Sequence, residues 1–405
     1  MAENWGDRLL LDDVCTLITD GSHFSPPTCE TGYPYITVRD VKEGKIDLSA
    51  CARIDGASFE DLERTGCRPQ VNDVLFSKDG TVGKVALVRT DVPFVVLSSL
   101  AILRADGLKI RPEYLAMVLS SPRFQEEAMG QKTGLAIKRV VLKNLRAMSI
   151  LVPSFPIQRR IVDLMTHLDN HLGNLRTERD AAERLLKSAR GHLIKPDETW
   201  ASTKLGDIAE VFDGPHATPK KTSVGPWYLS ISSLKQGRVD LVPSAHLNED
   251  EYATWTRRVK PELGDVLFSY ETRLGEAALW DQDDRAVLGR RMGLLRPKFE
   301  IILGEFLAQA YLSPSFQSEI EERAVRGSTV DRIPIAKMPD WPFPTPSLTV
   351  QREIVATISR VQAVSDSLEL EVKKLLSLRA YLLMMLMHGN LIVDSDYDTL
   401  LTEVA

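Results

Sequence analysis

The chain of 405 residues contains one pattern twice, and this internal repeat restricts the fold more than any other feature. The string Asp-Val-Leu-Phe-Ser stands at residues 73–77 and again, letter for letter, at 265–269. Ordered matches at a nearly constant offset indicate a tandem duplication, so we expect two copies of one unit. The other matches lie 192 or 193 residues apart and are Asp20, Gly21 and His23 with Asp213, Gly214 and His216, Glu113 with Glu305, Gln125 with Gln317, and Gln158-Arg159 with Gln351-Arg352.

Each half begins with a mixed segment and ends in a long helix. Short runs rich in β-branched residues and bounded by Gly, Asp, Asn and Pro predict strands in the first half at 35–38, 74–76, 85–88 and 95–103. A helical stretch at 112–131 and a short strand at 149–152 follow. A proline-marked hinge at 153–156 opens the long helix, and the second half repeats this order up to a second long helix after Pro346.

Both long helices carry a heptad pattern of apolar residues in the same register. An apolar repeat of 3.5 residues held over about five heptads keeps one seam facing a partner helix, so it predicts a coiled coil. The alternative is that each helix packs on the surface of its own domain. Gly191 and Gly389 are predicted to end the two helices, which would make the second helix about five residues longer. The main seam positions are Ile161, Leu168, Leu175, Leu186, Ile354, Val361, Leu368, Leu375 and Leu382.

The composition narrows the function classes. The chain is 43% hydrophobic and 26% charged, as is typical of a soluble globular protein. Its net charge of −6 argues against a nucleic-acid binder that is evenly coated with positive charge. The first residues form no basic and apolar leader, and the longest apolar runs fall short of the roughly 20 residues that span a bilayer. We therefore expect neither secretion nor a membrane span.

No motif in the sequence supplies catalytic chemistry. The chain has neither a GxxxxGK[ST] phosphate loop nor a GxGxxG dinucleotide loop, and Thr28 stands where an amino-methyltransferase motif at 25–28 would need an aromatic residue. The four cysteines show no paired spacing and are expected to be reduced thiols. We therefore expect no catalytic residue, metal or cofactor on this chain. An enzyme with an unrecognised site is retained as an alternative.

Two basic stretches at equivalent places, 132–148 and 323–337, are candidates for contacts with DNA phosphates. Lysine and arginine side chains beside a glycine-containing loop can lie along a phosphate backbone. The alternative is a solvated loop with incidental charge. The candidate residues are Lys132, Lys138, Arg139 and Lys143 in the first stretch and Arg326 and Arg332 in the second.

The loops that follow the two identical strands differ in chemistry. The first loop contains Lys78 and Lys84, whereas the second contains Tyr270, Glu271 and Arg273. The lysines, the tyrosine and the arginine can donate hydrogen bonds to base edges or phosphates, and Glu271 can accept one from a cytosine amino group. A shared scaffold with different loops suits two modules that read two different short sequences. Further candidates, each with a solvated surface residue as its alternative, are His23, His216, Lys220, Lys221, Arg290 and Arg291.

Taken together, these features resemble the specificity subunit of type I restriction-modification enzymes over residues 8–392. The resemblance rests on the two-fold repeat and on Asp-Val-Leu-Phe-Ser in each half. It also rests on the pattern Pro-x-x-x-x-Gln-Arg-x-Ile-Val, which opens each long helix at 153–162 and 346–355, and on the closing Gly-x-Leu-Ile at 191–194 and 389–392. Each short string is weak alone, and the set is specific.

The resemblance implies an α+β fold in which two mixed α/β target recognition domains are separated by two long antiparallel helices that form a coiled coil. The domains would span 1–153 and 196–346 and the helices 154–195 and 347–392, followed by an acidic tail at 393–405.

The resemblance also implies a prokaryotic, cytoplasmic subunit that performs no chemistry itself. Each half would read one part of a bipartite double-stranded DNA target. Two modification (methyltransferase) subunits, which bind S-adenosylmethionine, would dock on the helices, and two restriction subunits would join where restriction exists. The alternative is a coiled-coil scaffold or adaptor protein that does not bind DNA.

Overall fold

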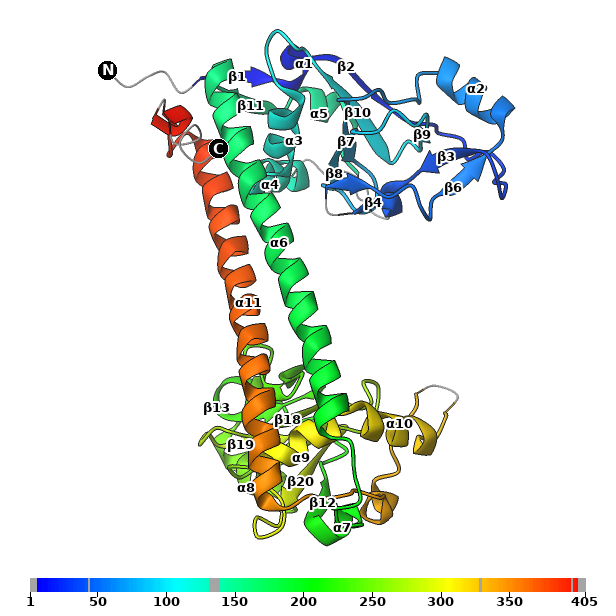
Figure 1. Cartoon of the computed structure of the whole chain (residues 1–405). Coiled ribbons are helices and arrows are strands. Elements are labelled where there is room, and N and C mark those ends of the chain that lie inside the picture. The colour runs from blue at the N-terminus through cyan, green and yellow to red at the C-terminus, as the bar shows by residue number, and fades with distance from the viewer. Residues whose placement is uncertain (1–5, 43, 131–138, 328–329, 395, 400–405) are drawn as a thin grey trace. The chain divides into compact units, whose positions relative to one another are not determined.

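The computed structural model describes residues 6–42, 44–130, 139–327, 330–394 and 396–399. The chain forms two compact units. Unit 1 consists of Met1–Asn174 and Val372–Ala405, and unit 2 of Leu175–Glu371. Each unit therefore contains one globular part together with one half of each long helix (Figure 1). None of the described helices is both long and apolar enough to cross a membrane.

The globular part of unit 1 is built around an antiparallel sheet of four strands in the order β2-β10-β7-β8. Its strands are β2 (Cys15–Asp20), β10 (Leu100–Ala105), β7 (Val74–Ser77) and β8 (Val85–Leu87). All four residues of β7 are buried, as the continuous apolar run of its sequence predicts for a central strand. A second sheet has the order β6-β3-β9, with β3 and β9 parallel, and is made of β3 (Tyr33–Ile36), β6 (Ala52–Ile54) and β9 (Val95–Val96).

The remaining elements of unit 1 close its core. The strand β1 (Asp7–Leu10) pairs with β11 (Ser149–Val152), and β4 (Val41–Lys42) forms a hairpin with β5 (Lys45–Ile46). Phe76 of the main sheet belongs to the same buried cluster as Tyr114, Ile161 and Leu386, so the sheet, its covering helices and the long helices share one core. The short helices are α1 (Leu11–Val14), α2 (Gly56–Arg64), α3 (Pro112–Ser120), α4 (Pro122–Gly130), α5 (Leu142–Arg146) and the 3-10 turn η1 (Val38–Asp40).

Unit 2 repeats this topology. Its main sheet has the order β12-β20-β17-β18, from β12 (Ala209–Asp213), β20 (Met292–Pro297), β17 (Val266–Ser269) and β18 (Ala277–Leu279). The second sheet has the order β16-β13-β19, from β16 (Ala245–Leu247), β13 (Lys221–Leu229) and β19 (Ala286–Leu288), and β14 (Leu234–Lys235) pairs with β15 (Arg238–Val239). The helices are α7 (Leu205–Ile208), α8 (Tyr252–Trp255), α9 (Gly304–Tyr311) and α10 (Pro314–Arg323), with 3-10 turns η2 (Ile231–Ser233), η3 (Glu249–Glu251) and η4 (Ile335–Asp340).

The two long helices, α6 (Phe155–Leu193) and α11 (Leu348–His388), pack together as an antiparallel pair (Figure 1). Arg379 of α11 forms a bidentate ion pair with Asp169 of α6 in unit 1. Ten residues further along α6 and ten residues back along α11, Arg179 lies 3.5 Å from Glu369 in unit 2. This order is that of antiparallel helices, and the expected α+β architecture with its two-fold repeat is confirmed. Of the expected seam positions, Ile161, Leu175, Leu186 and Ile354 are buried, and Leu168, Val361, Leu368, Leu375 and Leu382 are half-buried.

The ends of the two helices differ from the prediction. The helices have 39 and 41 residues, so the second helix is longer by two residues rather than about five. Gly389 follows α11 directly with φ +73°, the left-handed conformation of a helix-ending glycine. Gly191 does not end α6, because the chain continues to Leu193 and the Ile194 amide still bonds to the Arg190 carbonyl at 3.0 Å.

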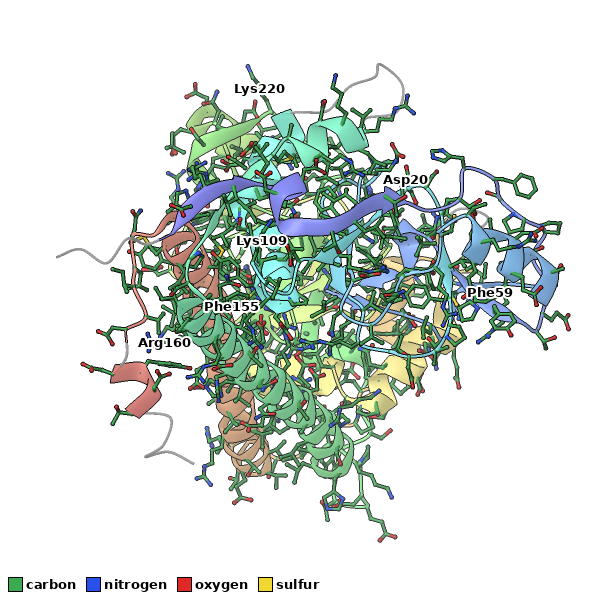
Figure 2. All side chains as sticks on the ribbon, turned by 90° about the horizontal axis from the view of Figure 1, so that it is seen from above. Asp20, Phe59, Lys109, Phe155, Arg160 and Lys220 are labelled. Atoms are coloured by element: carbon green, nitrogen blue, oxygen red, sulfur yellow. The ribbon has the colours of Figure 1, made fainter. Side chains whose placement is uncertain are left out.

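The tail folds back on the start of α6 within unit 1. Val393 is buried, and Asp398 accepts hydrogen bonds from Arg159 and Arg160 at 3.0 and 2.7 Å, beside the labelled Arg160 in Figure 2. These guanidinium groups, Arg160 foremost, lower the pKa of the Asp398 carboxyl. Part of the predicted acidic tail is therefore bound to the helix by charge, while residues 395 and 400–405 lie outside the described ranges.

A buried glutamine fixes the start of each long helix. In unit 1, Gln158 accepts from the Arg111 amide at 2.8 Å and donates to the Lys109 and Pro153 carbonyls at 3.1 and 2.8 Å. In unit 2, Gln351 accepts from the Leu303 amide and donates to the Ile301 and Pro346 carbonyls, all at 2.9 Å. Both side chains are completely buried. The repeated Gln-Arg motif is therefore explained by a hydrogen-bond network between the helix and the loop that precedes α3 or α9.

We expect Gln351→Leu to lower the free energy of unfolding of unit 2 by about 2–4 kcal/mol, because three backbone groups lose their buried partner. Hydrogen exchange followed by mass spectrometry should show faster exchange at the start of α11 and before α9. Gln158→Leu is the matched variant and should produce the same change around the start of α6. Unchanged exchange in both variants would show that these bonds do not hold the helices.

Candidate nucleic-acid interface

In each unit, three loops meet at one end of the strands of the main sheet, and we call this end the sheet edge. The strands β2 and β7 both run antiparallel to β10, so their carboxyl ends lie at the edge where β10 begins. In unit 1 the Gly21 amide bonds to the Leu100 carbonyl at 3.2 Å, and the Lys78 amide bonds to the Ser99 carbonyl at 2.8 Å. Figure 2 labels Asp20 at the end of β2. The Asp-Gly-x-His segment, the loop after β7 and the turn before β10 therefore meet there.

In unit 1, Lys78 is a buried cation between two carboxylates. Only 5% of the residue is exposed, and its Nζ lies 3.1 Å from both Asp20 Oδ2 and Asp79 Oδ2. The His23 ring lies 3.4 Å from the other Asp20 oxygen. The basic stretch joins the same site, because the backbones of Arg139 and Asp79 form an antiparallel β-bridge and the Val140 amide bonds to the Lys78 carbonyl at 2.8 Å. Lys78 thus holds loops together in the free protein instead of projecting from them.

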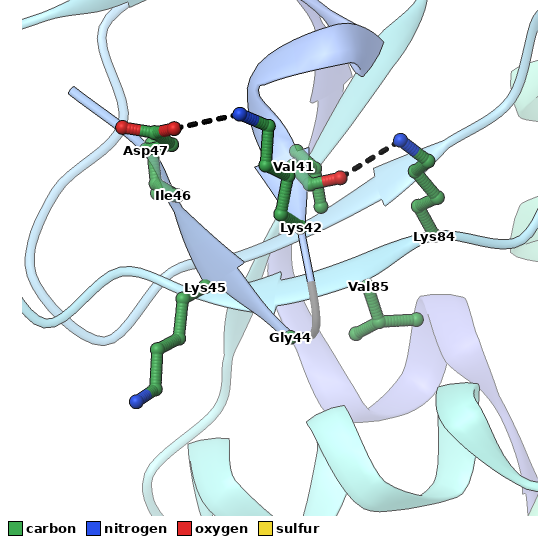
Figure 3. Close-up of a pocket in the computed structure, with 8 residues that line it drawn as sticks. All are labelled: Val41, Lys42, Gly44, Lys45, Ile46, Asp47, Lys84 and Val85. Carbon is green, nitrogen blue, oxygen red and sulfur yellow. Dashed lines mark hydrogen bonds and ion pairs between the residues drawn. The ribbon is translucent and has the colours of Figure 1, made fainter. Parts of the chain in front are cut away.

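Lys84 has a similar internal role. Its Nζ donates to the carbonyls of Val38 and Val41 at 2.9 and 2.8 Å, which ties the loop after β7 to the start of the β4–β5 hairpin (Figure 3). An open pocket of about 790 Å³ lies beside it, lined also by Lys42, Lys45 and Asp47. Lys42 forms an ion pair with Asp47 at 2.8 Å. Lysines therefore line this pocket, and two of them, Lys84 and Lys42, are already bonded within the chain.

The equivalent edge of unit 2 has the same backbone and different side chains. The Tyr270 amide bonds to the Arg291 carbonyl at 3.1 Å, and the Ile333 amide bonds to the Tyr270 carbonyl at 2.8 Å. The backbones of Glu271 and Arg332 form an antiparallel β-bridge, and the Glu271 carboxylate lies 2.9 Å from Arg291 Nε. Burial raises the pKa of the Tyr270 hydroxyl, and the charges of Glu271 and Asp213 raise it further. The hydroxyl therefore stays protonated and can donate.

The other predicted residues lie around these two sites. Arg273 pairs with Glu276 at 2.6 Å, Arg326 with Asp331 at 2.6 Å, and His216 lies 3.2 Å from Asp213. Several cations expected to face DNA thus already have acidic neighbours. Arg273, Arg326 and His216 are nevertheless exposed. The other predicted residues with exposed side chains are His23, Lys143 on α5, Arg139, Lys220, Lys221, Arg290 and Arg332. Lys132 and Lys138 lie outside the described residues. The two basic stretches are also not single loops, because the first contains α5 and the second includes the end of α10 and the start of η4.

The positions that hold these loops were missed as site residues, although the repeat marks them. Gln125 donates to the Gly83 carbonyl at 2.9 Å, and Gln317 donates to the Gly275 carbonyl at 3.0 Å. Gly83 has φ +102° and a Cβ there would lie 1.9 Å from Gln125 Oε1, so this turn requires glycine. The repeated Pro-x-Phe-Gln string is therefore a brace behind the loop after β7 and β17.

The aspartate of each Asp-Val-Leu-Phe-Ser string braces the sheet itself. Asp73 receives two hydrogen bonds from Arg104 at 2.8 Å, and Asp265 receives two from Arg296 at 3.0 and 2.8 Å. Both aspartates are 1% exposed. Among the described residues no group of three or more His, Cys, Asp or Glu side chains could hold a metal ion. The repeated motifs thus build a scaffold, and the side chains that differ between the units lie at its edge.

Comparison with known families agrees with this geometry. The family "Type I restriction modification DNA specificity domain" matches residues 3–184 and 197–377. The chain therefore belongs to this family and contains two copies of its domain, as the resemblance in the sequence predicted.

Two relatives come from distant organisms. The chain is 25% identical over 223 residues to a putative type I restriction enzyme specificity subunit, MjaX, of Methanocaldococcus jannaschii, an alignment that covers 51% of this chain and 50% of the relative. It is 28% identical over 162 residues to the EcoBI specificity subunit of Escherichia coli, covering 40% of this chain and 34% of that subunit. The chain thus spans half or less of the length of these relatives.

Solved structures share the fold along nearly the whole chain. A structure from a study of complex assembly and conformational transition of the type I R-M system has a TM-score of 0.57 at 18% identity, covering 96% of this chain and 99% of the other. The crystal structure of a type I restriction-modification S subunit from M. genitalium has a TM-score of 0.54 at 16% identity, covering 96% and 98%.

The different placements of Lys78 and Arg139 predict different effects on DNA binding. We expect Arg139→Gln to reduce the slope of log affinity against log salt by about 0.9, because each side-chain cation that binds a phosphate releases roughly one counterion from the DNA. Lys78→Met should leave this slope within error and instead lower the free energy of unfolding by about 3 kcal/mol, since it leaves two carboxylates facing each other. Salt titrations by fluorescence anisotropy and thermal melts measure the two effects. An equal loss of slope in both variants would place Lys78 on a phosphate.

Proposed function

We propose that this chain is the DNA specificity subunit of a type I restriction-modification complex, in which each unit reads one half of a bipartite target. The observation that carries this proposal is the pair of equivalent loop sites. Their backbone bonds match, as in Lys78 with Ser99 and Tyr270 with Arg291, while their side chains do not. A duplicated scaffold with unlike side chains at its edge suits the reading of two unlike sequences.

The helix pair acts as the spacer between the half-sites. At 1.5 Å per residue, the 39 residues of α6 extend about 58 Å. DNA rises about 3.4 Å per base pair, so a helix of fixed length sets a fixed number of base pairs between the two half-sites. The ion pairs of Asp169 with Arg379 and of Arg179 with Glu369 keep the register of the two helices.

The helices also provide the surface on which modification subunits dock. Several large apolar side chains of α11 are exposed in the unit 1 half, and the most exposed of these, Tyr381, is 54% exposed. Exposed apolar residues that are close together along a helix favour a protein partner. In this assembly the modification subunits bind S-adenosylmethionine and methylate adenine, this chain performs no chemistry, and restriction subunits join where cleavage occurs. The complex then acts in a prokaryotic cytoplasm. The exposed residues are Leu376, Leu378, Tyr381 and Met384.

The same exposed apolar side chains of α11 favour a second function, that of a coiled-coil adaptor that binds proteins and not DNA. Gel shifts with bipartite target DNA, with and without modification subunits, separate the two functions. Sequence-dependent binding in either condition supports the specificity subunit. Binding of modification subunits without any sequence-dependent shift would support the adaptor.

A matched insertion in both helices tests the spacer. We expect one additional heptad in α6 within residues 181–188, together with one at the facing position of α11, to lengthen the recognised gap and leave both half-site sequences unchanged. The heptad preserves the seam and moves the units by about 10 Å along the helix, or roughly three base pairs. Sequencing of methylated adenines in cells that express the variant complex measures the gap. Altered half-sites with the original gap would contradict the spacer role.

A further inference from the structure

Buried polar atoms without partners mark the same position in both units. In the described part of the chain, Asp79 Oδ1 and Ser99 Oγ of unit 1 and Tyr270 Oη of unit 2 have no hydrogen-bond partner. Beside Tyr270, Arg291 Nε lies 2.9 Å from Glu271 Oε2 but is not aligned for a hydrogen bond. The offset of 192 residues makes Asp79 equivalent to Glu271, Ser99 to Arg291 and Lys78 to Tyr270. The matching backbone bonds at this edge confirm that equivalence. The duplication has therefore kept an unsatisfied polar position at one place.

An unsatisfied buried donor or acceptor costs about 1–3 kcal/mol, so such atoms are nearly always bonded to protein, to water or to a ligand. In this protein the free-energy cost arises once in each unit, at the sheet edge where the Asp-Gly-x-His segment meets the loop after β7 or β17. The side chains can still reach a ligand, because Asp79, Glu271 and Arg291 are 23%, 26% and 35% exposed. The position is thus prepared for hydrogen bonds that the free chain does not make.

The chemistry of the position differs between the units. In unit 1, Lys78 Nζ lies 3.1 Å from Asp79 Oδ2, and Asp79 Oδ1 is an acceptor without a donor. In unit 2, the Arg291 guanidinium donates to Thr272 Oγ1 at 3.1 Å and contacts Glu271, while its Nε lacks an aligned acceptor. Unit 1 therefore presents an acceptor where unit 2 presents a donor.

We propose that Asp79 and Arg291 are the specificity-determining residues of their units, and that each specifies a G·C pair in the major groove, Asp79 from the cytosine and Arg291 from the guanine. This inference rests on the proposed function. A carboxylate has only acceptors, which suits the cytosine N4 amino group and opposes adenine, whose amino group stands beside the N7 acceptor. A guanidinium donates to guanine O6 and N7. Lys78 is then a positioning residue that orients the Asp79 carboxylate.

The test uses the complete chain in its complex with modification subunits, and the readout is the methylated DNA motif from single-molecule sequencing. We expect Asp79→Ala to relax one C·G position of one half-site by about 10- to 100-fold in discrimination. Arg291→Asn should relax a G·C position of the other half-site to the same extent. Asparagine is chosen because residue 291 has φ +72°, a conformation that asparagine tolerates. The spacer and the untouched half-site of the same motif show that each variant complex is folded.

Two exposed residues away from the sheet edge serve as matched controls. Asp61→Ala on α2 and Arg285→Asn, whose partners are Arg64 and Glu249, should leave the motif unchanged. An unchanged motif in Asp79→Ala or Arg291→Asn would overturn the inference, and so would relaxation at an A·T position or in the same half-site for both. Methylation by the wild-type complex without a bipartite motif would overturn the proposed function instead.

Discussion

The hydrogen bonds of the two buried glutamines, Gln158 and Gln351, are the interaction on which the rest of the structure depends. Each side chain is buried and satisfies one backbone amide and two carbonyls, which fixes the direction in which a long helix leaves its globular unit. A helix of about 40 residues amplifies any error at its start, since a tilt of a few degrees displaces the far end by several ångströms. The spacer of defined length that we propose therefore requires a rigid polar junction, because apolar packing alone would not fix the direction of the helix.

In the proposed function, the duplication separates residues that build the fold from residues that read DNA. Residues with identical bonds in both units, such as Asp73 with Arg104 and Asp265 with Arg296, hold the central strands. Side chains at the sheet edge, such as Lys78 and Tyr270, have equivalent backbones and unrelated chemistry. Because the backbone is fixed by the first group, the second can change without loss of the fold. In the proposed function, this arrangement allows one scaffold to carry two specificities.

The sequence was informative wherever a pattern is local or repeated. The two-fold repeat follows from matching strings, and the two long helices follow from apolar periodicity, because burial imposes that periodicity on a helix. Two predicted elements were too long. The strand predicted at 95–103 is two strands of different sheets, β9 and β10, and the helix predicted at 112–131 is the pair α3 and α4. The end of α6 did not follow, since a glycine stops a helix only when its backbone turns left-handed, and Gly191 does not. The burial of Lys78 could not be foreseen either. It depends on Asp20, a carboxylate 58 residues away in the chain that only the sheet brings to 3.1 Å.

Acidic side chains of the chain lie beside the cations that are candidates for DNA contacts. Lys78, Arg273, Arg291 and Arg326 all lie against carboxylates in the free protein, so they contribute little to a general attraction for phosphates. Such pairs lower non-specific affinity and hold each side chain near one orientation. A base that offers a better-aligned partner gains from this order, whereas a mismatched base leaves buried polar atoms unpaired. In the proposed assembly, the partner subunits can then supply most of the phosphate contacts, and the two units of this chain contribute selectivity rather than strength.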